Sequence, residues 1–171
     1  MADAATMTLK AVLLPDEIQK TLIDLTATYA PANATEGWYY GVVDVLHGSS
    51  NNLITPGSLY LQFGGTAAGV DAGSAMHGIA AGDKVKFLFI KNLATTDDGS
   101  TASTNSVYLT FDGGAAAHNT TDAFEVEDGE SWYCKPGCTV DEIKAKGGTA
   151  NKAGAASTAT QCMVAAIIDN V

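Results

Sequence analysis

The sequence contains no arginine. Its nine basic residues are all lysines, and they stand against nineteen aspartates and glutamates, for a net charge of −10. Arginine supplies the forked donors that recognise phosphates and base edges, and affinity for nucleic acid depends on neutralising phosphate charge. An anionic membrane surface repels an acidic chain for the same reason. We therefore expect neither nucleic acid nor a membrane as a partner.

Long apolar runs are also missing, since no stretch approaches the roughly 18 apolar residues of a transmembrane helix. At the N-terminus, Asp3 stands where a signal peptide would carry positive charge, and the apolar run from Ala11 to Leu14 is broken by Pro15. We expect a protein that is made and kept in a cytosol, or assembled there into something larger.

Cysteine is scarce, with three residues in 171. Cys134 and Cys138 are separated by three residues, a spacing that matches neither a zinc knuckle nor a thioredoxin motif. Two free thiols beside a Pro-Gly turn are the favoured interpretation. A strained local disulfide and a metal site are the alternatives.

No group of residues indicates catalysis. Ser131 lies in a Gly-Glu-Ser-Trp-Tyr segment that resembles the start of a nucleophile elbow, but the elbow requires glycine where Tyr133 stands. All three histidines (His47, His77 and His118) precede this serine, so none follows it to complete a triad. The acidic residues are mostly at turns and lack the ligand spacing of a calcium loop. We predict no enzymatic activity, no catalytic or metal-binding residues and no cofactor.

Aromatic residues allow two interpretations. Trp38, Tyr39, Tyr40, Trp132 and Tyr133 could form a platform for sugars. In strands, however, such residues more often pack in the core or across strands, and we favour that interpretation.

The pattern of the chain is typical of an antiparallel β protein of one domain. Short alternating or fully apolar runs are separated by turns rich in Gly, Asp, Ser and Thr. Strands are expected at residues 38–46, 59–63, 84–91, 107–112, 124–126, 131–134 and 161–168. Residues 64–81 and 147–160 are expected to be loops, and residues 139–146 are ambiguous between strand and helical turn.

Two alternatives remain open for residues 1–14, an N-terminal arm or a first strand. After them, Pro15 and two acidic residues resemble the start of a helix, because proline and negative charge both favour the first helical turn. Apolar residues at Ile18, Leu22, Ile23 and Leu25 supply one face. We predict one short helix from Asp16 to Thr26.

Alternation also predicts which residues point into the core. In residues 84–91, Val85, Phe87 and Phe89 are assigned to one face, and Leu88 and Ile90 to the other. The complete set of predicted inward positions is Val85, Phe87, Phe89, Leu109, Phe111, Phe124, Val126 and Ile167. The predicted fold is mainly β, an antiparallel two-sheet sandwich of jelly-roll type that covers residues 15–171.

Part of the chain resembles a known family. Residues 107–114 read VYLTFDGG, and they are followed by an apolar strand with a Gly-Glu turn into Trp132, by TVDEIKA at residues 139–145, and by a final apolar strand at residues 163–168. This succession resembles the β-sandwich virion proteins of tailed bacteriophages. The match covers about half of the chain and consists of turns and core positions.

The resemblance implies a capsid decoration (cement) protein, assembled in the host cytoplasm and bound to the major capsid protein on the outer surface of the virion. A homo-oligomer, with a trimer favoured, suits a symmetric shell. The alternative is a phage tail or host-attachment module that binds carbohydrate. Docking residues are expected in the segment from Thr6 to Leu14, and these are Met7, Leu9, Val12 and Leu13. The competing interpretation of this segment is an edge strand of the sandwich.

Overall fold

The structure is a computed structural model that describes residues 5–13, 20–29, 31–32, 35–62, 75–116, 121–149, 152–153 and 158–171. It confirms a mainly β protein with antiparallel sheets, in which 52% of residues are in strands and 3% in helix. Among the described residues, no helix is long and apolar enough to span a membrane.

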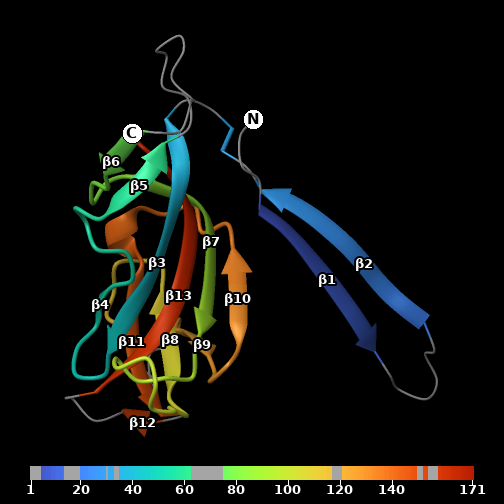
Figure 1. Ribbon diagram of the computed structural model, residues 1–171, viewed down its shortest axis with the longest axis vertical. Coiled ribbons are helices and arrows are strands. Elements are labelled where there is room, and N and C mark those ends of the chain that lie inside the picture. The colour runs from blue at the N-terminus through green and yellow to red at the C-terminus, as the bar shows by residue number, and fades with distance from the viewer. Residues whose placement is uncertain are drawn as a thin grey trace.

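The largest sheet has six strands in the order β10-β7-β13-β3-β5-β6 (Figure 1). Its members are β3 (Glu36–Leu46), β5 (Leu59–Gln62), β6 (Ala75–Gly78), β7 (Lys84–Asn92), β10 (Ser131–Cys134) and β13 (Ala159–Asp169). The central strand β13 pairs antiparallel with β3 on one side and with β7 on the other. The pairing with β3 is regular along the whole of β13, so these two strands form the backbone of the sheet.

A second sheet has five strands, in the order β12-β11-β8-β9, with β4 paired to β11 beside this path. These strands are β4 (Asn51–Asn52), β8 (Ser106–Thr110), β9 (Phe124–Val126), β11 (Lys144–Thr149) and β12 (Lys152–Ala153). A single turn of 3-10 helix, η1 (Val140–Glu142), leads into β11 and carries a capping box between Thr139 and Glu142. The ambiguous segment 139–146 is thus a helical turn followed by a strand.

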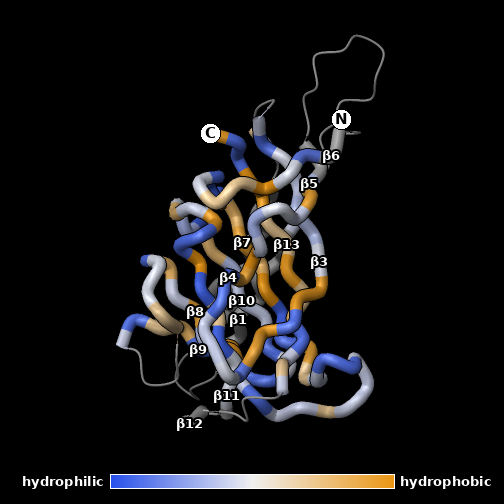
Figure 2. The backbone as a smooth tube through the Cα atoms, turned by 90° about the vertical axis from the view of Figure 1, so that its left-hand side faces the viewer, coloured by the Kyte–Doolittle hydropathy of each residue, from blue (hydrophilic) through white to orange (hydrophobic). Residues whose placement is uncertain are grey.

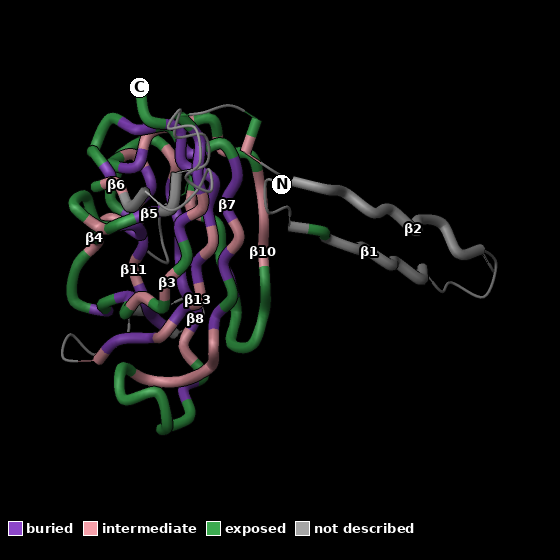
Figure 3. The backbone as a smooth tube through the Cα atoms, turned by 45° about the horizontal axis from the view of Figure 1, so that its top comes forward, coloured by how far each residue is buried: buried purple, intermediate pink, exposed green. Residues whose placement is uncertain are grey.

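One hydrophobic core serves both sheets. Leu88 and Ile90 of β7 and Val164 of β13 are fully buried, and they belong to the same apolar cluster as Val107 and Leu109 of β8. Figure 3 shows the buried stretches along β7 and β13. Burial of apolar surface shared by the two sheets is the main source of their stability.

The strands predicted within residues 36–62 and from residue 84 onward are confirmed, with shifts of a few residues at their ends. The expected loop at residues 64–81 contains β6, and the expected loop at residues 147–160 contains the end of β11 and β12. The other residues of these two loops between 63 and 74, and at 150–151 and 154–157, lie outside the described part of the chain.

Five of the eight predicted inward residues are buried: Val85, Phe87, Leu109, Val126 and Ile167. Phe89 and Phe111 are only half-buried. The prediction that Phe124 points into the core is wrong, since 49% of its surface is exposed. Phe124 begins β9, a three-residue strand at the edge of its sheet, where the rings of Phe111 and Trp132 cover only part of its side chain.

The predicted faces of β7 also need correction. The pairing of β7 with β13 shifts at Lys86, since Ile167 lies opposite Phe87 and Ile168 opposite Val85. This bulge turns Val85 to the core side with Leu88 and Ile90, while Phe87 lies on the other side of the sheet. A regular alternation could not predict that reversal.

The predicted helix from Asp16 to Thr26 is wrong where the structure describes it. Residues from Lys20 onward belong to β2 (Lys20–Tyr29), which pairs antiparallel with β1 (Ala5–Leu13). Residues 14–19 lie outside the described part of the chain. The physical reason is the two-residue period of Ile23, Leu25, Ala27 and Tyr29 between polar residues, a pattern that suits a strand with one apolar face.

Candidate interaction site

The β1–β2 hairpin, called the arm below, forms a two-stranded sheet of its own and stands apart from the two larger sheets in Figure 1. Its register is regular from the pair of Ala5 and Tyr29 to the pair of Ala11 and Ile23. Directly opposed residues lie on the same face of an antiparallel pair. This register therefore assigns every residue of the regular segment to one of two faces.

The two faces of the arm differ completely in polarity. One face, called the apolar arm face below, consists of Ala5, Met7, Leu9, Ala11, Ile23, Leu25, Ala27 and Tyr29. The other face carries three opposed pairs of polar residues, which are Thr6 with Thr28, Thr8 with Thr26, and Lys10 with Asp24. The register thus sorts the sequence of the arm into an apolar and a polar face, the alternation that is typical of a strand pair with two unlike sides.

The four docking residues proposed from the sequence all lie in β1. Met7 and Leu9 belong to the apolar arm face. Val12 and Leu13 follow a register shift after Ala11 and lie at the far end of the strand. In the structure β1 pairs with β2 and is not a strand of either larger sheet.

The arm joins the rest of the protein at an anchored connection. The Thr35 hydroxyl donates to Asp169 Oδ1 at 2.7 Å, and the Asn170 backbone N–H donates to the Thr35 carbonyl at 3.1 Å. The Ala32 N–H donates to Glu36 Oε2 at 2.6 Å, and Lys86 Nζ lies 3.4 Å from Asp169 Oδ2. These bonds fix the point from which the arm leaves, at the end of β13.

A second apolar surface lies on the side of the six-stranded sheet that faces away from the core. Registered pairs place Tyr40, Ala165, Phe89 and Tyr133 in one row across β3, β13, β7 and β10. The row on one side of it consists of Trp38, Ile167 and Phe87. The row on the other side begins with the apolar residues Val42 and Met163 and ends with the polar residues Lys91 and Ser131. We call the nine apolar residues of these rows the outer face; Figure 2 shows the apolar character of β3, β7 and β13.

Of the nine residues of the outer face, Tyr40 and Val42 are exposed, Phe87 and Ile167 are buried, and the other five are half-buried. Tyr40 is 66% exposed and Val42 52%, and on the same strand Leu46 is 45% exposed. On the neighbouring strand β5, Leu61 pairs with Trp38, and Leu59, two residues earlier, therefore lies on the same face. Leu59 is 56% exposed. Large exposed apolar residues that gather on one sheet face indicate a contact with another protein surface.

The five aromatic residues proposed as a sugar platform are divided between two sides of the sheet. Trp38, Tyr40 and Tyr133 lie on the outer face, with the Trp38 ring 6.0 Å from the Phe87 ring in an edge-on contact. Tyr39 is buried in the core. Trp132 instead packs beside the core with Phe111 and Phe124, at ring distances of 5.6 and 4.9 Å.

The residues weighed for catalysis lie apart. Ser131 is exposed and begins β10, where it pairs with Lys91. His47 is 1% exposed; its Nδ1 lies 2.6 Å from the Thr158 hydroxyl and its Nε2 2.8 Å from that of Thr160. The ring of His77 packs 6.1 Å from that of Tyr60, and His118 lies outside the described residues.

Acidic side chains at turns stabilise the turns themselves. In the loop after β7, Asp98 accepts hydrogen bonds from Thr96, Ser100 and Thr101. These bonds, those from Thr101 above all, hold the pKa of Asp98 well below its usual range. Within the described residues, no group of three or more His, Cys, Asp or Glu side chains is arranged to hold a metal ion.

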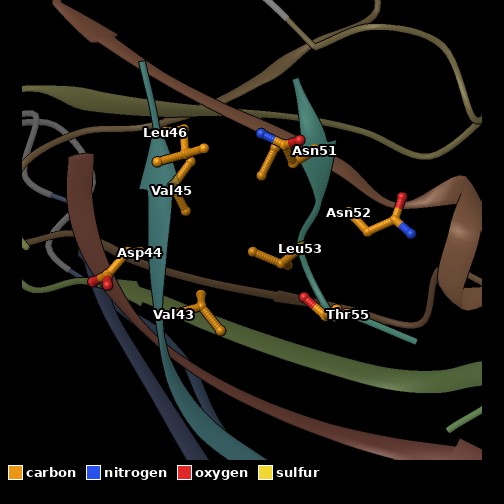
Figure 4. A pocket seen from close by; sticks show the side chains of 9 residues that line it. Val43, Asp44, Val45, Leu46, Asn51, Asn52, Leu53 and Thr55 are labelled. Carbon is orange, nitrogen blue, oxygen red and sulfur yellow. The ribbon is translucent and has the colours of Figure 1, made fainter. Parts of the chain in front are cut away.

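A small pocket of about 170 Å³ opens between the end of β3 and the segment around β4 (Figure 4). It is lined by Val43, Asp44, Val45, Leu46, Asn51, Asn52, Leu53, Thr55 and Ala145. At its side, Lys144 Nζ donates to Asn52 Oδ1 at 2.5 Å. The lining combines apolar side chains with the amides of Asn51 and Asn52, the carboxylate of Asp44 and the hydroxyl of Thr55.

All three cysteines are free thiols. Burial raises the pKa of Cys134 to about 12 and that of Cys138 to about 11, with the carboxylate of Glu142 adding to the shift at Cys138. Burial also raises the pKa of Cys162, in the core, to about 12. Since the thiolate is the reactive form, these side chains are poor nucleophiles near neutral pH.

We expect all three thiols of the folded protein to react with iodoacetamide at pH 8 at least ~100-fold more slowly than an unperturbed cysteine, because the thiolate fraction falls tenfold per unit of raised pKa. Mass spectrometry of labelled peptides measures each site, and the same labelling in urea is the control. Rapid labelling of Cys134 or Cys138 in the folded state contradicts the expectation.

Comparison with known proteins finds no matching family model, no matching curated protein and no matching solved structure.

Proposed function

We propose that this protein is a non-enzymatic structural protein of a virion, which decorates and stabilises an icosahedral phage capsid on its outer surface. The observation that carries the proposal is the arm. Its two strands pair with each other and belong to neither larger sheet, and it extends from a body in which one apolar cluster joins both of those sheets. A stable body with a separate attachment element suits a protein whose role is to bind a lattice.

The proposed body is a two-sheet sandwich of jelly-roll type. The support for it is the single apolar cluster to which β3, β7 and β13 of one sheet and β8, β9 and β11 of the other contribute. Two sheets that share one core in this way are the usual solution for a mainly antiparallel protein of this size. The acidic charge of the chain favours separation of neighbouring particles in solution.

The proposed partner-binding residues are Met7, Leu9, Val12 and Leu13, and the proposed partner is a neighbouring protein of the particle, either the major capsid protein or another copy of this chain. On a shell with many identical sites, a small contact per copy suffices because several linked copies bind with avidity. This reasoning favours a small cyclic homo-oligomer such as a trimer.

The alternative function is a tail or host-attachment module that binds carbohydrate. The observation in its favour is the aromatic row of Tyr40, Phe89 and Tyr133 on the outer face, because flat apolar rings can stack on sugars. The five-residue platform suggested by the sequence does not gather on one side, so only part of it could take this role.

The experiment that tests the proposal is binding of the full-length protein to undecorated phage capsid shells, measured by co-sedimentation and by electron microscopy of the shells. We expect regular extra density at symmetry-related positions. Leu9→Lys should weaken binding at least tenfold, since it places a charge on the apolar arm face, whereas Thr8→Lys on the opposite face of β1 serves as the matched control. Failure to bind any shell, together with binding to tail tips or to surface glycans, contradicts capsid decoration and supports the alternative.

A further inference from the structure

We infer that residues 40–46 of β3 form an open strand edge that binds an extended segment of another protein, which joins the six-stranded sheet as a further antiparallel strand. The inference goes beyond the proposed function and does not depend on it, because this edge belongs to the body and not to the arm. It is drawn from the backbone groups of β3, from the pocket beside them and from the side chains along the edge.

The strand β3 is paired along its whole length on one side only. On that side β13 covers it from Glu36 to Leu46, whereas on the other side β5 pairs only with Gly37 and Trp38. Beyond Trp38, the second side of β3 is therefore an edge of the sheet. The open edge of residues 40–46 extends about 23 Å at the usual rise per strand residue.

The hydrogen bonds to β13 show which backbone groups face the open edge. Just after β3, the His47 N–H donates to the Thr158 carbonyl at 3.1 Å, in line with the β13 register. Backbone groups of successive strand residues point to opposite sides, so the odd-numbered residues of β3 bond to β13 and the even-numbered ones face away. Among the described residues, no backbone partner contacts the N–H and C=O groups that face the edge, those of Tyr40, Val42, Asp44 and Leu46.

These backbone groups determine what can bind at the open edge. Four N–H donors and four C=O acceptors at strand spacing are complementary to the backbone of another extended chain. Natural edge strands are usually protected by short length, lysine, proline or a bulge. The edge strand β10 has four residues and is followed by Lys135 and Pro136. Residues 40–46 contain neither lysine nor proline and pair with β13 without a bulge, so they have the form of a strand acceptor.

The pocket in Figure 4 lies beside the open edge. Val43 and Val45 line it from β3, and Leu53 and Thr55 line it from the segment across. Residues of an added strand that lie opposite Val43 and Val45 point to this same side of the sheet. Since a cavity of about 150 Å³ can hold a benzene molecule, the pocket of about 170 Å³ has room for one aliphatic side chain of the added strand.

The opposite side of the edge determines the charge of the expected partner. Tyr40, Val42, Asp44 and Leu46 are all exposed there, and Asp44 is the only charged residue among residues 40–46. The residue of an added strand directly opposite Asp44 lies about 5 Å away between β-carbons. A lysine or arginine at that position forms an attractive pair. The expected partner segment therefore alternates apolar residues, which face the pocket side, with polar residues that include a basic one.

The first test is amide hydrogen exchange of the full-length protein, followed residue by residue by NMR. The amides of Val42 and Asp44 should exchange at least tenfold faster than those of Val43 and Val45, because only the latter bond to β13. Equal protection of all four amides in the free protein overturns the inference, since this chain or a second copy then already fills the edge.

The second test adds a fluorescein-labelled peptide of the sequence TVKVTVT, which places its lysine opposite Asp44 in an antiparallel pairing. We expect a Kd below about 1 mM by fluorescence anisotropy, together with new protection of the Val42 and Asp44 amides. N-methylation of the lysine and the middle threonine removes N–H donors that face β3 and should abolish binding. N-methylation of two valines, whose N–H groups face away from β3, is the matched control and should preserve it.

The third test reverses the charge of the edge. Asp44→Lys should weaken binding of this peptide about tenfold, since an attractive pair becomes a repulsive one, and should strengthen binding of the peptide with glutamate in place of lysine. Asp128→Lys, in the exposed turn before β10, should change neither affinity. Far-UV circular dichroism verifies that both variants are folded.

Two peptide results overturn the inference: no binding at about 1 mM peptide, or equal binding of the two N-methylated peptides, which would show that the contact does not use the backbone. Neither result bears on the proposed function, because capsid binding is assigned to the arm. Conversely, a protein that binds the peptide but no capsid shell keeps the strand-accepting edge and loses the decoration function.

Discussion

Replacing Gly147 with alanine is expected to lower the free energy of unfolding by about 3 kcal/mol. A β-carbon at this position would lie 2.1 Å from Cδ2 and 2.6 Å from Nε2 of His47, and 3.1 Å from the carbonyl oxygen of Val45. The ring cannot easily move aside, because its nitrogens are bound to Thr158 and Thr160. Urea unfolding followed by tryptophan fluorescence measures the change.

The matched control is Gly78→Ala, since Gly78 is also a strand glycine, with nothing within 4 Å of the added carbon. It should change stability by less than ~0.5 kcal/mol, as surface substitutions usually do. Adding His47→Ala should reduce the cost of Gly147→Ala, because neighbouring substitutions that share a contact are not additive. Equal costs of Gly147→Ala with and without the histidine would show that the ring is not what excludes the side chain.

A second large effect is expected in the core. Leu109→Ala should cost about 2–5 kcal/mol, because the side chain is fully buried between strands and its removal leaves a cavity. Phe124→Ala removes a larger side chain but should cost only about 1 kcal/mol. Its surface is 49% exposed, and its main contacts are the rings of Phe111 and Trp132, at 5.7 and 4.9 Å.

Thermal or urea unfolding of the two variants under identical conditions gives the comparison. The order of the two costs is the decisive result, because alternation in the sequence places both residues on inward faces. If Phe124→Ala proved as costly as Leu109→Ala, Phe124 would have to be covered in solution by something beyond this chain.

Sequence alone predicted the strands of the body well because their signals are local. The stretches that became β3, β7, β8 and β13 are short apolar or alternating runs between turn-forming residues, and such patterns predict strands whatever their partners are. Burial of Leu109 and Val126 followed from the same alternation. What alternation could not predict is the bulge at Lys86, which depends on how β7 pairs with β13 and turns Val85 to the core.

The arm shows why the prediction of a helix from Asp16 to Thr26 failed. Pro15 and its acidic neighbours imitate the start of a helix, and apolar residues at Leu22 and Leu25 fit a helical face as well as a strand. The decisive signal is the match between two segments, in which Met7 and Leu9 lie opposite Ala27 and Leu25. That match can be recognised only when the two segments are compared with each other. Likewise, the outer face is assembled from rows across four strands, and no single strand reveals it.

The pairing of β13 with β3 has a consequence for how the protein folds. The two strands that form the centre of the six-stranded sheet are far apart in sequence; Ala165, for example, pairs with Tyr40, about 125 residues earlier. Ordering so long an intervening chain costs entropy before the central pairing can repay it, and proteins with such distant contacts fold slowly, on a scale of about milliseconds to seconds. On the ribosome, β3 and β7 emerge long before the strand that joins them, and their apolar edges stay open during that interval. Nascent chains are therefore most vulnerable to aggregation just before β13 is synthesised.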